Sequence, residues 1–187
     1  MERNLMIAGF GGQGVMTMGK LLAEATSEAT DLNVTFFPSY GAAMRGGTAN
    51  CYVVISDDPI GAPVSYSLED LVVMNGPSLH KFIDNLKPGG NLFVNSTIVT
   101  DPIERDDINI IEAPVTQMAI DINNPRALNV IMLGVYVGAT DAVPEEVIVK
   151  GINHKFERKP KLIEPNVEAF KMGLEIGRAQ KKKLVLY

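Results

Sequence analysis

Cysteine, histidine and tryptophan are scarce in this chain of 187 residues, which has one cysteine, two histidines and no tryptophan. A single cysteine excludes a disulfide within the chain, and on its own it cannot supply the thiolates that hold a zinc ion or an iron–sulfur cluster. His80 and His154 each lack a second histidine at metal-ligand spacing, so we expect no metal site. With so few histidines and no strained serine turn, a Ser–His–Asp hydrolase is also disfavoured.

Positive charge and long apolar runs are limited as well. The chain has 17 Lys and Arg against 22 Asp and Glu, a net charge of −5, whereas general nucleic-acid-binding proteins present a basic face. The apolar stretch from Ala127 to Thr140 is shorter than the roughly 20 residues of a membrane-spanning helix. Residues 1–4 lead directly into an apolar strand and do not resemble a signal peptide. We therefore expect a cytoplasmic protein that binds neither nucleic acid nor membrane.

A glycine-rich turn between a strand and a helix organises the beginning of the chain. The stretch Leu5 to Ala8 is wholly apolar, as in a strand that is covered on both faces. From Val15 to Ala25, apolar residues recur at steps of three and four, which is typical of a helix with one buried face. Strand, glycine turn and helix together form the first unit of a doubly wound α/β domain.

The turn itself, with Gly9, Gly11 and Gly14, matches a dinucleotide-binding fingerprint in which backbone N–H groups at a helix N-terminus approach an anion. The fingerprint also needs an acidic residue about 20 positions later to hold the ribose, and none stands near Thr35. We therefore disfavour bound NAD. A turn that serves only close packing between strand and helix is an alternative interpretation.

Later apolar runs predict one α/β Rossmann-like domain over residues 1–187, with a mostly parallel sheet flanked by helices and a helical C-terminal third. Pro38 should end the second strand, because proline has no N–H for a central ladder. The stretch from Lys87 to Gly90 should separate a helix over 79–86 from the next strand. The further strands are expected at 34–37, 49–55, 71–74, 91–95 and 108–111, and the further helices at 115–122, 127–140, 145–156 and 166–180.

A second glycine-rich segment follows the second predicted strand. It contains Ser39, Tyr40 and Gly41, and further on Arg45 followed by Gly46-Gly47. Arg45 offers a fixed positive charge beside flexible backbone donors, which suits an anionic group such as a phosphate. Loops that follow parallel strands emerge at one edge of the sheet, so we expect both glycine-rich segments there. A solvated or loop-bracing charge is the simpler alternative for Arg45.

These motifs together resemble the gamma subunits of 2-oxoacid:ferredoxin oxidoreductases. The residues that carry the resemblance are Gly9-Phe10-Gly11-Gly12-Gln13-Gly14-Val15, Pro38-Ser39-Tyr40-Gly41, Arg45-Gly46-Gly47-Thr48-Ala49-Asn50-Cys51, Met74-Asn75-Gly76-Pro77-Ser78-Leu79 and Lys87-Pro88-Gly89-Gly90. The resemblance covers essentially the whole chain, in order and with similar spacing. It is greatest for the 2-oxoglutarate and branched-chain 2-oxoacid (ketoisovalerate) members, and 2-oxoglutarate is the implied substrate.

The resemblance implies that the chain is part of an enzyme complex. Such complexes oxidatively decarboxylate a 2-oxoacid, attach the acyl group to coenzyme A and pass electrons to ferredoxin. Thiamine diphosphate, magnesium and [4Fe–4S] clusters are held by other subunits, so this chain is expected to bind no cofactor alone and to be inactive alone. The implied partners are alpha and beta subunits, a ferredoxin-like delta subunit in some members, and ferredoxin as acceptor. The isolated chain could also pair with itself.

The gamma chain is expected to pack over the thiamine site and to help admit or hold coenzyme A. The residues expected on the edge that faces coenzyme A or a partner have positioning roles, and none is catalytic or binds metal. They are Gly9, Gly11, Gly12, Gln13, Gly14, Ser39, Tyr40, Gly41, Arg45, Gly46 and Gly47. Two alternatives stay open: a structural subunit whose loops only dock onto partners, and a stand-alone NAD- or nucleotide-binding protein.

Overall fold

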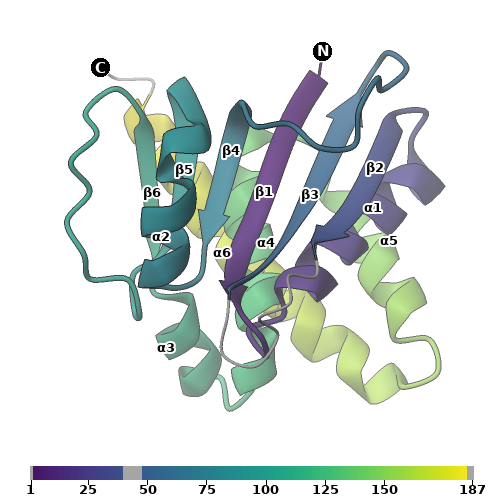
Figure 1. The fold of residues 1–187 in the computed structure, drawn as a ribbon. Coiled ribbons are helices and arrows are strands. Elements are labelled where there is room, and N and C mark those ends of the chain that lie inside the picture. Colours follow the sequence, from purple (N-terminus) through teal and green to yellow (C-terminus); the bar gives the residue numbers. More distant parts are fainter. Residues whose placement is uncertain (1, 40–47, 185–187) are drawn as a thin grey trace.

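The computed structural model describes residues 2–39 and 48–184, which form a six-stranded sheet covered by helices (Figure 1). The sheet has the order β2-β3-β1-β4-β5-β6. The strands are β1 (Glu2–Phe10), β2 (Asn33–Ser39), β3 (Thr48–Ser56), β4 (Leu68–Val73), β5 (Leu86–Asn95) and β6 (Asn109–Ala113). β3 is antiparallel to both of its neighbours, and the other pairs are parallel. Five of the six strands therefore point the same way, which confirms the mostly parallel α/β sheet.

Helices cover the two faces of the sheet unequally. One face is covered by α1 (Val15–Ala29), α4 (Leu128–Thr140) and α6 (Ile163–Leu184), and α5 (Glu145–Lys155) packs against α1 on the same side. The other face packs against α2 (Gly76–Phe82), which lies in front of the sheet in Figure 1. The short α3 (Val115–Asp121) follows β6, and three 3₁₀ turns cover 83–85, 125–127 and 160–162. The helical C-terminal third is thus confirmed.

The apolar run of β1 is explained by burial on both faces. Leu5 and Ile7 belong to the core under α1 and α4, whereas Met6 and Ala8 belong to the core under α2. All four are at most 1% exposed. Alternate residues of a strand point to opposite faces, so this stretch of a central strand, which is covered on both faces, is apolar at every position.

Four glycines let α4 and α6 approach each other backbone to backbone. A Cβ on Gly134 or Gly138 would lie 2.1 or 2.3 Å from a backbone oxygen of α6. A Cβ on Gly173 or Gly177 would lie 1.9 or 2.2 Å from a backbone oxygen of α4. No side chain fits at these positions, so glycine is required by contact rather than by backbone angle. With this cover and the sheet beneath it, the apolar α4 is buried within the chain itself.

Several element boundaries differ from the sequence-based expectation. The helix expected over 79–86 is α2 over Gly76–Phe82 followed by a 3₁₀ turn, and α6 begins at Ile163 instead of 166. Pro38 was expected to end the second strand, but it lies inside β2, which continues to Ser39. β2 is an edge strand that pairs with β3 on one side only, so a proline without an N–H is tolerated there. The stretch from Lys87 to Gly90 was expected as a connector, but it belongs to β5. An irregularity in the pairing of β4 with β5 accommodates it, and there Gly89 has a φ of 76°.

The outer strand β6 is in contact with the C-terminal helix. Gln180 of α6 accepts a hydrogen bond from the backbone N–H of Glu112 at 3.1 Å, and its Nε2 donates to the Glu112 carbonyl at 2.5 Å. One side-chain amide therefore takes the place of a neighbouring strand at this residue. Within residues 2–39 and 48–184, no helix combines the length and apolar character that a membrane span requires.

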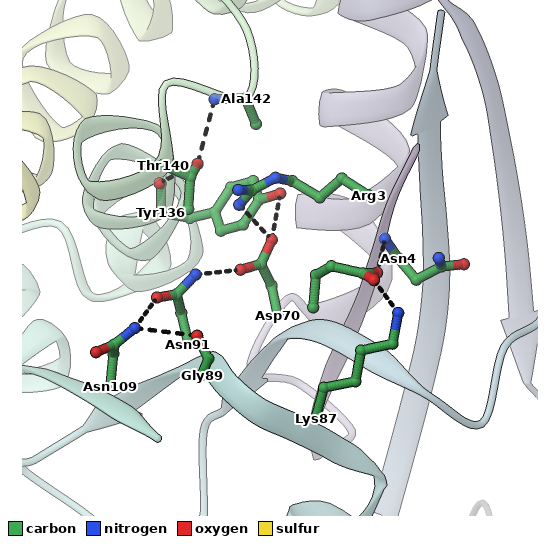
Figure 2. Close-up of polar contacts among 11 residues, drawn as sticks. Arg3, Asn4, Asp70, Lys87, Gly89, Asn91, Asn109, Tyr136, Thr140 and Ala142 are labelled. Atoms are coloured by element: carbon green, nitrogen blue, oxygen red, sulfur yellow. Dashed lines mark hydrogen bonds and ion pairs between the residues drawn. The ribbon is translucent and has the colours of Figure 1, made fainter. Parts of the chain in front are cut away.

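A row of polar side chains, buried at Asp70 and half-buried at Asn91 and Asn109, crosses the sheet near the amino ends of its strands (Figure 2). Asp70, Asn91 and Asn109 are aligned by strand register, with hydrogen bonds of 2.8 Å from Asn91 to Asp70 and 3.0 Å from Asn109 to Asn91. Arg3 pairs with Asp70 at 2.7 Å, and the Tyr136 hydroxyl donates to the same carboxylate at 3.3 Å. Burial raises the pKa of Asp70, although the charge of Arg3 opposes that rise.

Candidate functional site

The carboxyl ends of β1 and β4 lie next to each other at the centre of the sheet. β1 pairs with β3 on one side and with β4 on the other, and the connections that follow run toward opposite sides of the sheet. Such a switch point in an open α/β sheet is a common place for ligands. The turns 11–14 and 74–75 follow the two strands there, and Figure 1 shows both strands ending at the lower edge of the sheet.

Two of the predicted site glycines serve packing inside the chain. A Cβ on Gly9 would lie 2.8 Å from Oε1 of Gln13 and 2.8 Å from Cβ of Met74. Gly14 precedes α1 with a φ of 75°, and a Cβ there would lie 2.6 Å from the side chain of Asn129. Both positions therefore need glycine whatever the turn contacts outside the chain.

Gly11 and Gly12 are exposed, and no described residue lies within 4 Å of a Cβ added to either. Gly12 has a φ of 94°, which favours glycine, but Gly11 does not have a positive φ. The helix α1 begins just after them, with no acidic residue in its first turn and no side chain as its N-cap. The positive end of the α1 dipole is thus uncompensated by side chains of its own first turn.

The side chain of Gln13 turns toward the neighbouring strand. Its Oε1 accepts hydrogen bonds from the Phe10 N–H at 2.7 Å and from Asn75 Nδ2 at 3.3 Å. Its Nε2 donates to the Met74 carbonyl at 2.9 Å. Gln13 therefore links the turn after β1 to the turn after β4.

The second predicted segment can be placed only at its ends. Ser39, the last residue of β2, pairs with Asn50 of β3, and Thr48, the first residue of β3, pairs with Phe10 at the end of β1. Ser39 and Thr48 therefore lie at the same edge of the sheet as the turn 11–14. Five predicted site residues lie outside the described residues, namely Tyr40, Gly41, Arg45, Gly46 and Gly47.

Three buried asparagines at this edge were missed as site residues. Asn75 and Asn95 are 0% exposed and Asn129 is 6% exposed. Asn75 caps α2 by accepting from the Ser78 N–H at 2.9 Å, and Asn129 donates to the Gly14 carbonyl at 3.3 Å. Asn75 and Asn95 each stand at the end of an apolar strand, and that position is the sequence signal that could have identified them.

The residues that link the turns 11–14 and 74–75 offer amides and backbone groups, which can orient a ligand but cannot transfer protons. An ammonium group also reaches this edge, because Lys81 Nζ lies 3.5 Å from Thr48 Oγ1. Cys51 is buried in β3, where burial raises the pKa of its thiol to about 12, so it is a poor nucleophile. His80 lies 3.3 Å from Asp101, but both side chains are largely exposed. Among the described residues, His, Cys, Asp and Glu do not gather in a group of three or more that could hold a metal ion.

Known proteins are similar in sequence to most of this chain. A family model described as pyruvate ferredoxin/flavodoxin oxidoreductase matches residues 4–176. The ketoisovalerate oxidoreductase subunit VorA of Methanothermobacter thermautotrophicus is 35% identical over 178 residues, which are 95% of this chain and 37% of VorA. The chain therefore spans little more than a third of the length of that relative. The 2-oxoglutarate synthase subunit KorC of Methanocaldococcus jannaschii is 31% identical over 180 residues, or 95% of each chain.

A solved structure supports the same grouping. The gamma subunit of a keto/oxoacid ferredoxin oxidoreductase from Geobacter sulfurreducens is similar with a TM-score of 0.85 and 28% identity. The similarity covers 96% of this chain and 98% of that subunit. The likeness therefore extends over the sheet and both helical layers.

Proposed function

Because the chain belongs to the pyruvate ferredoxin/flavodoxin oxidoreductase family, we propose that it is the gamma subunit of a 2-oxoacid:ferredoxin oxidoreductase. The complex converts a 2-oxoacid, coenzyme A and oxidised ferredoxin into acyl-coenzyme A, CO₂ and reduced ferredoxin. The proposed 2-oxoacid is 2-oxoglutarate. The observation that carries the proposal is the similarity to KorC over 95% of both chains, because it aligns one subunit with another nearly end to end.

The proposed partners are the alpha and beta subunits, with a ferredoxin-like delta subunit in some complexes and ferredoxin as electron acceptor. In VorA the similar region makes up 37% of a longer polypeptide. A region that is covalently joined to other parts of an oxidoreductase subunit in one relative is well suited to bind such parts in another. The proposed complex is cytoplasmic, and residues 1–187 act in it as one gamma-type domain.

In this proposal the reacting groups belong to the other subunits. They hold thiamine diphosphate, magnesium and the [4Fe–4S] clusters, and the gamma chain contributes the edge around Gly11, Gly12 and the start of α1. Coenzyme A carries phosphate groups, which suit a helix N-terminus without acidic side chains. The edge positions coenzyme A or the active-site entrance, and it makes or breaks no bond.

Gly11 gives the sharpest test of this role. Its own φ and its surroundings do not demand glycine, so Gly11→Ala should leave the stability of the chain within about 0.5 kcal/mol of the original. In the assembled complex the added methyl group should raise the KM for coenzyme A about tenfold, equivalent to ~1.4 kcal/mol, with little change in kcat. Steady-state rates of ferredoxin reduction with 2-oxoglutarate measure both constants.

A matched control is Gly61→Ala, because Gly61 likewise has no described residue within 4 Å of an added Cβ. It should change neither the stability nor the KM. An unchanged KM for coenzyme A in an assembled Gly11→Ala complex would contradict the coenzyme A role. Loss of assembly with alpha and beta would instead support the alternative in which this edge only docks onto partners. Rates with 2-oxoglutarate, 3-methyl-2-oxobutanoate and pyruvate test the proposed substrate.

A further inference from the structure

We propose that Gln13, Asn75 and Asn95 form an amide clamp that fixes the shape of the Gly9–Gly14 turn and so positions coenzyme A. The inference rests on the proposed function, because it assigns these three amides a positioning role in that site. None of the three needs to touch coenzyme A. They act through the backbone of the turn and through the neighbouring turn after β4.

The first part of the clamp is the fully used amide of Gln13. Its oxygen accepts from the Phe10 N–H at 2.7 Å, and its nitrogen donates to the Met74 carbonyl at 2.9 Å. The two ends of the amide thus have opposite requirements, since one must accept and the other must donate. A carboxylate can meet the first requirement but not the second, and a hydrocarbon side chain can meet neither.

The second part of the clamp extends from β4 to β5. Asn75 Nδ2 donates to Gln13 Oε1 at 3.3 Å. Asn95 Nδ2 donates to the Met74 carbonyl at 3.4 Å and to Thr116 Oγ1 at 2.9 Å. The Met74 carbonyl therefore receives amide donors from both sides, and the connection reaches the first turn of α3. Asn75 and Asn95 are 0% exposed, so each of these groups would be costly to leave unpaired.

The packing around the amide shows that the turn is built to hold it. A Cβ on Gly9 would lie 2.8 Å from Gln13 Oε1, so glycine at this position makes room for the Gln13 side chain. Gly11 and Gly12, two and three positions after Gly9, are exposed at the edge. The clamp therefore joins the buried part of the turn to the part that is available to a ligand.

Two variants of Gln13 separate the clamp from a general packing role. In Gln13→Glu, an ionised carboxylate faces the Met74 carbonyl and cannot donate to it, so the KM for coenzyme A should rise about tenfold at pH 8. When the carboxyl is protonated at lower pH, it can donate again, and the KM should return toward the original value. The described residues in contact with the Gln13 amide carry no titratable side chain. The phosphate monoester of coenzyme A titrates near pH 6, so the new carboxyl is read from the difference between the profile of Gln13→Glu and that of the original chain. In Gln13→Met, which has a similar shape and no strong hydrogen-bonding group, the KM should be raised at every pH.

The experiment uses the assembled complex and profiles the KM for coenzyme A from pH 8 down to about pH 4.5, near the ordinary pKa of a glutamate. Amide hydrogen exchange of the Phe10 N–H in the full chain is an independent readout. Gln13→Met should exchange this proton at least tenfold faster at pH 8, because it has lost the acceptor of the Phe10 N–H. Gln13→Glu keeps an oxygen that can accept from this N–H, so its exchange should stay close to that of the original chain. If Gln13→Glu does not fold, Gln13→Met carries the test through the same two measurements. In Gln13→Met, a raised KM with unchanged exchange at Phe10 would overturn the clamp, because Gln13 would then act by direct contact. An unchanged KM in both variants would also overturn it. If Gly11→Ala still raises the KM for coenzyme A in that case, the proposed function stands and only the clamp fails. If Gly11→Ala does not raise it either, the clamp and the proposed coenzyme A role both fail.

Discussion

Gly173→Ala should destabilise the chain, although alanine is the better helix former. In the interior of a helix, replacing glycine by alanine gains about 1 kcal/mol from propensity alone. At position 173, however, the new Cβ would lie 1.9 Å from the Ile131 carbonyl oxygen and 2.9 Å from the Val135 nitrogen. The outcome depends on which of these two effects is larger.

The steric effect is the larger one. To reach a normal contact distance, α6 must move away from α4 by roughly 1 Å or more. The opposing atoms belong to the backbone, so no side-chain rotation can relieve the contact, and the cost should lie at or above the upper end of the usual ~1–3 kcal/mol for overpacking. After subtraction of the propensity gain, we expect a net loss of about 2 kcal/mol or more. For a chain of this size, that loss lowers Tm by about 4–8 °C.

Urea and thermal unfolding followed by circular dichroism measure this change. The control is Lys171→Ala on the same helix, where the side chain is exposed and the free energy of unfolding should change by less than about 0.5 kcal/mol. If Gly173→Ala were more stable than the original chain by about 1 kcal/mol, propensity would have prevailed. The close backbone contact between α4 and α6 would then be refuted.

Two further predictions concern buried ionisable groups. Because burial raises the pKa of Asp70 in the folded chain, protonation of Asp70 stabilises the folded state. This contribution to stability is fully present below the unfolded pKa of about 4 and is lost as the pH rises through the folded pKa. In urea titrations, the free energy of unfolding of the original chain minus that of Asp70→Asn should therefore fall between pH 4 and pH 8. If this difference stayed constant or grew, the raised pKa of Asp70 would be contradicted. With a pKa of about 12, only about one Cys51 thiol in ten thousand is ionised at pH 8 in the folded chain, so a disulfide reagent should react at the rate of unfolding. Fast labelling without urea would show that the thiol is accessible.

The sequence predicts the parts of the fold that depend on neighbouring residues. The apolar run from Leu5 to Ala8 and the periodic stretch after Gly14 identify β1 and α1 because burial on two faces or on one face leaves a local pattern. Pro38 was misjudged for a nonlocal reason. Whether proline is tolerated in a strand depends on the place of that strand in the sheet, and β2 is at the edge.

The sequence names Gln13 and the glycines of the turn as candidate site residues, but it does not indicate which way Gln13 points or that Asn75 and Asn95 join it. The glycines point to a close turn, and the order of strands and loops places Ser39 and the turn 11–14 at one edge. The inward direction of Gln13 could not be read from the sequence, because its partner Met74 lies 61 positions away. The roles of Asn75 and Asn95 likewise depend on the pairing of three strands, which no local pattern encodes.

The contact between Gln180 and Glu112 has a consequence for how the protein meets other chains. An incoming strand at the β6 side would have to displace an amide that already occupies both backbone groups of Glu112. At the opposite side of the sheet, Pro38 has no N–H to give to an added strand. Both edge strands of the sheet thus disfavour the addition of a strand from another chain, including edge-to-edge aggregation of copies. Subunits that assemble with this domain are thereby directed to its loops and helices, where side chains can discriminate between partners.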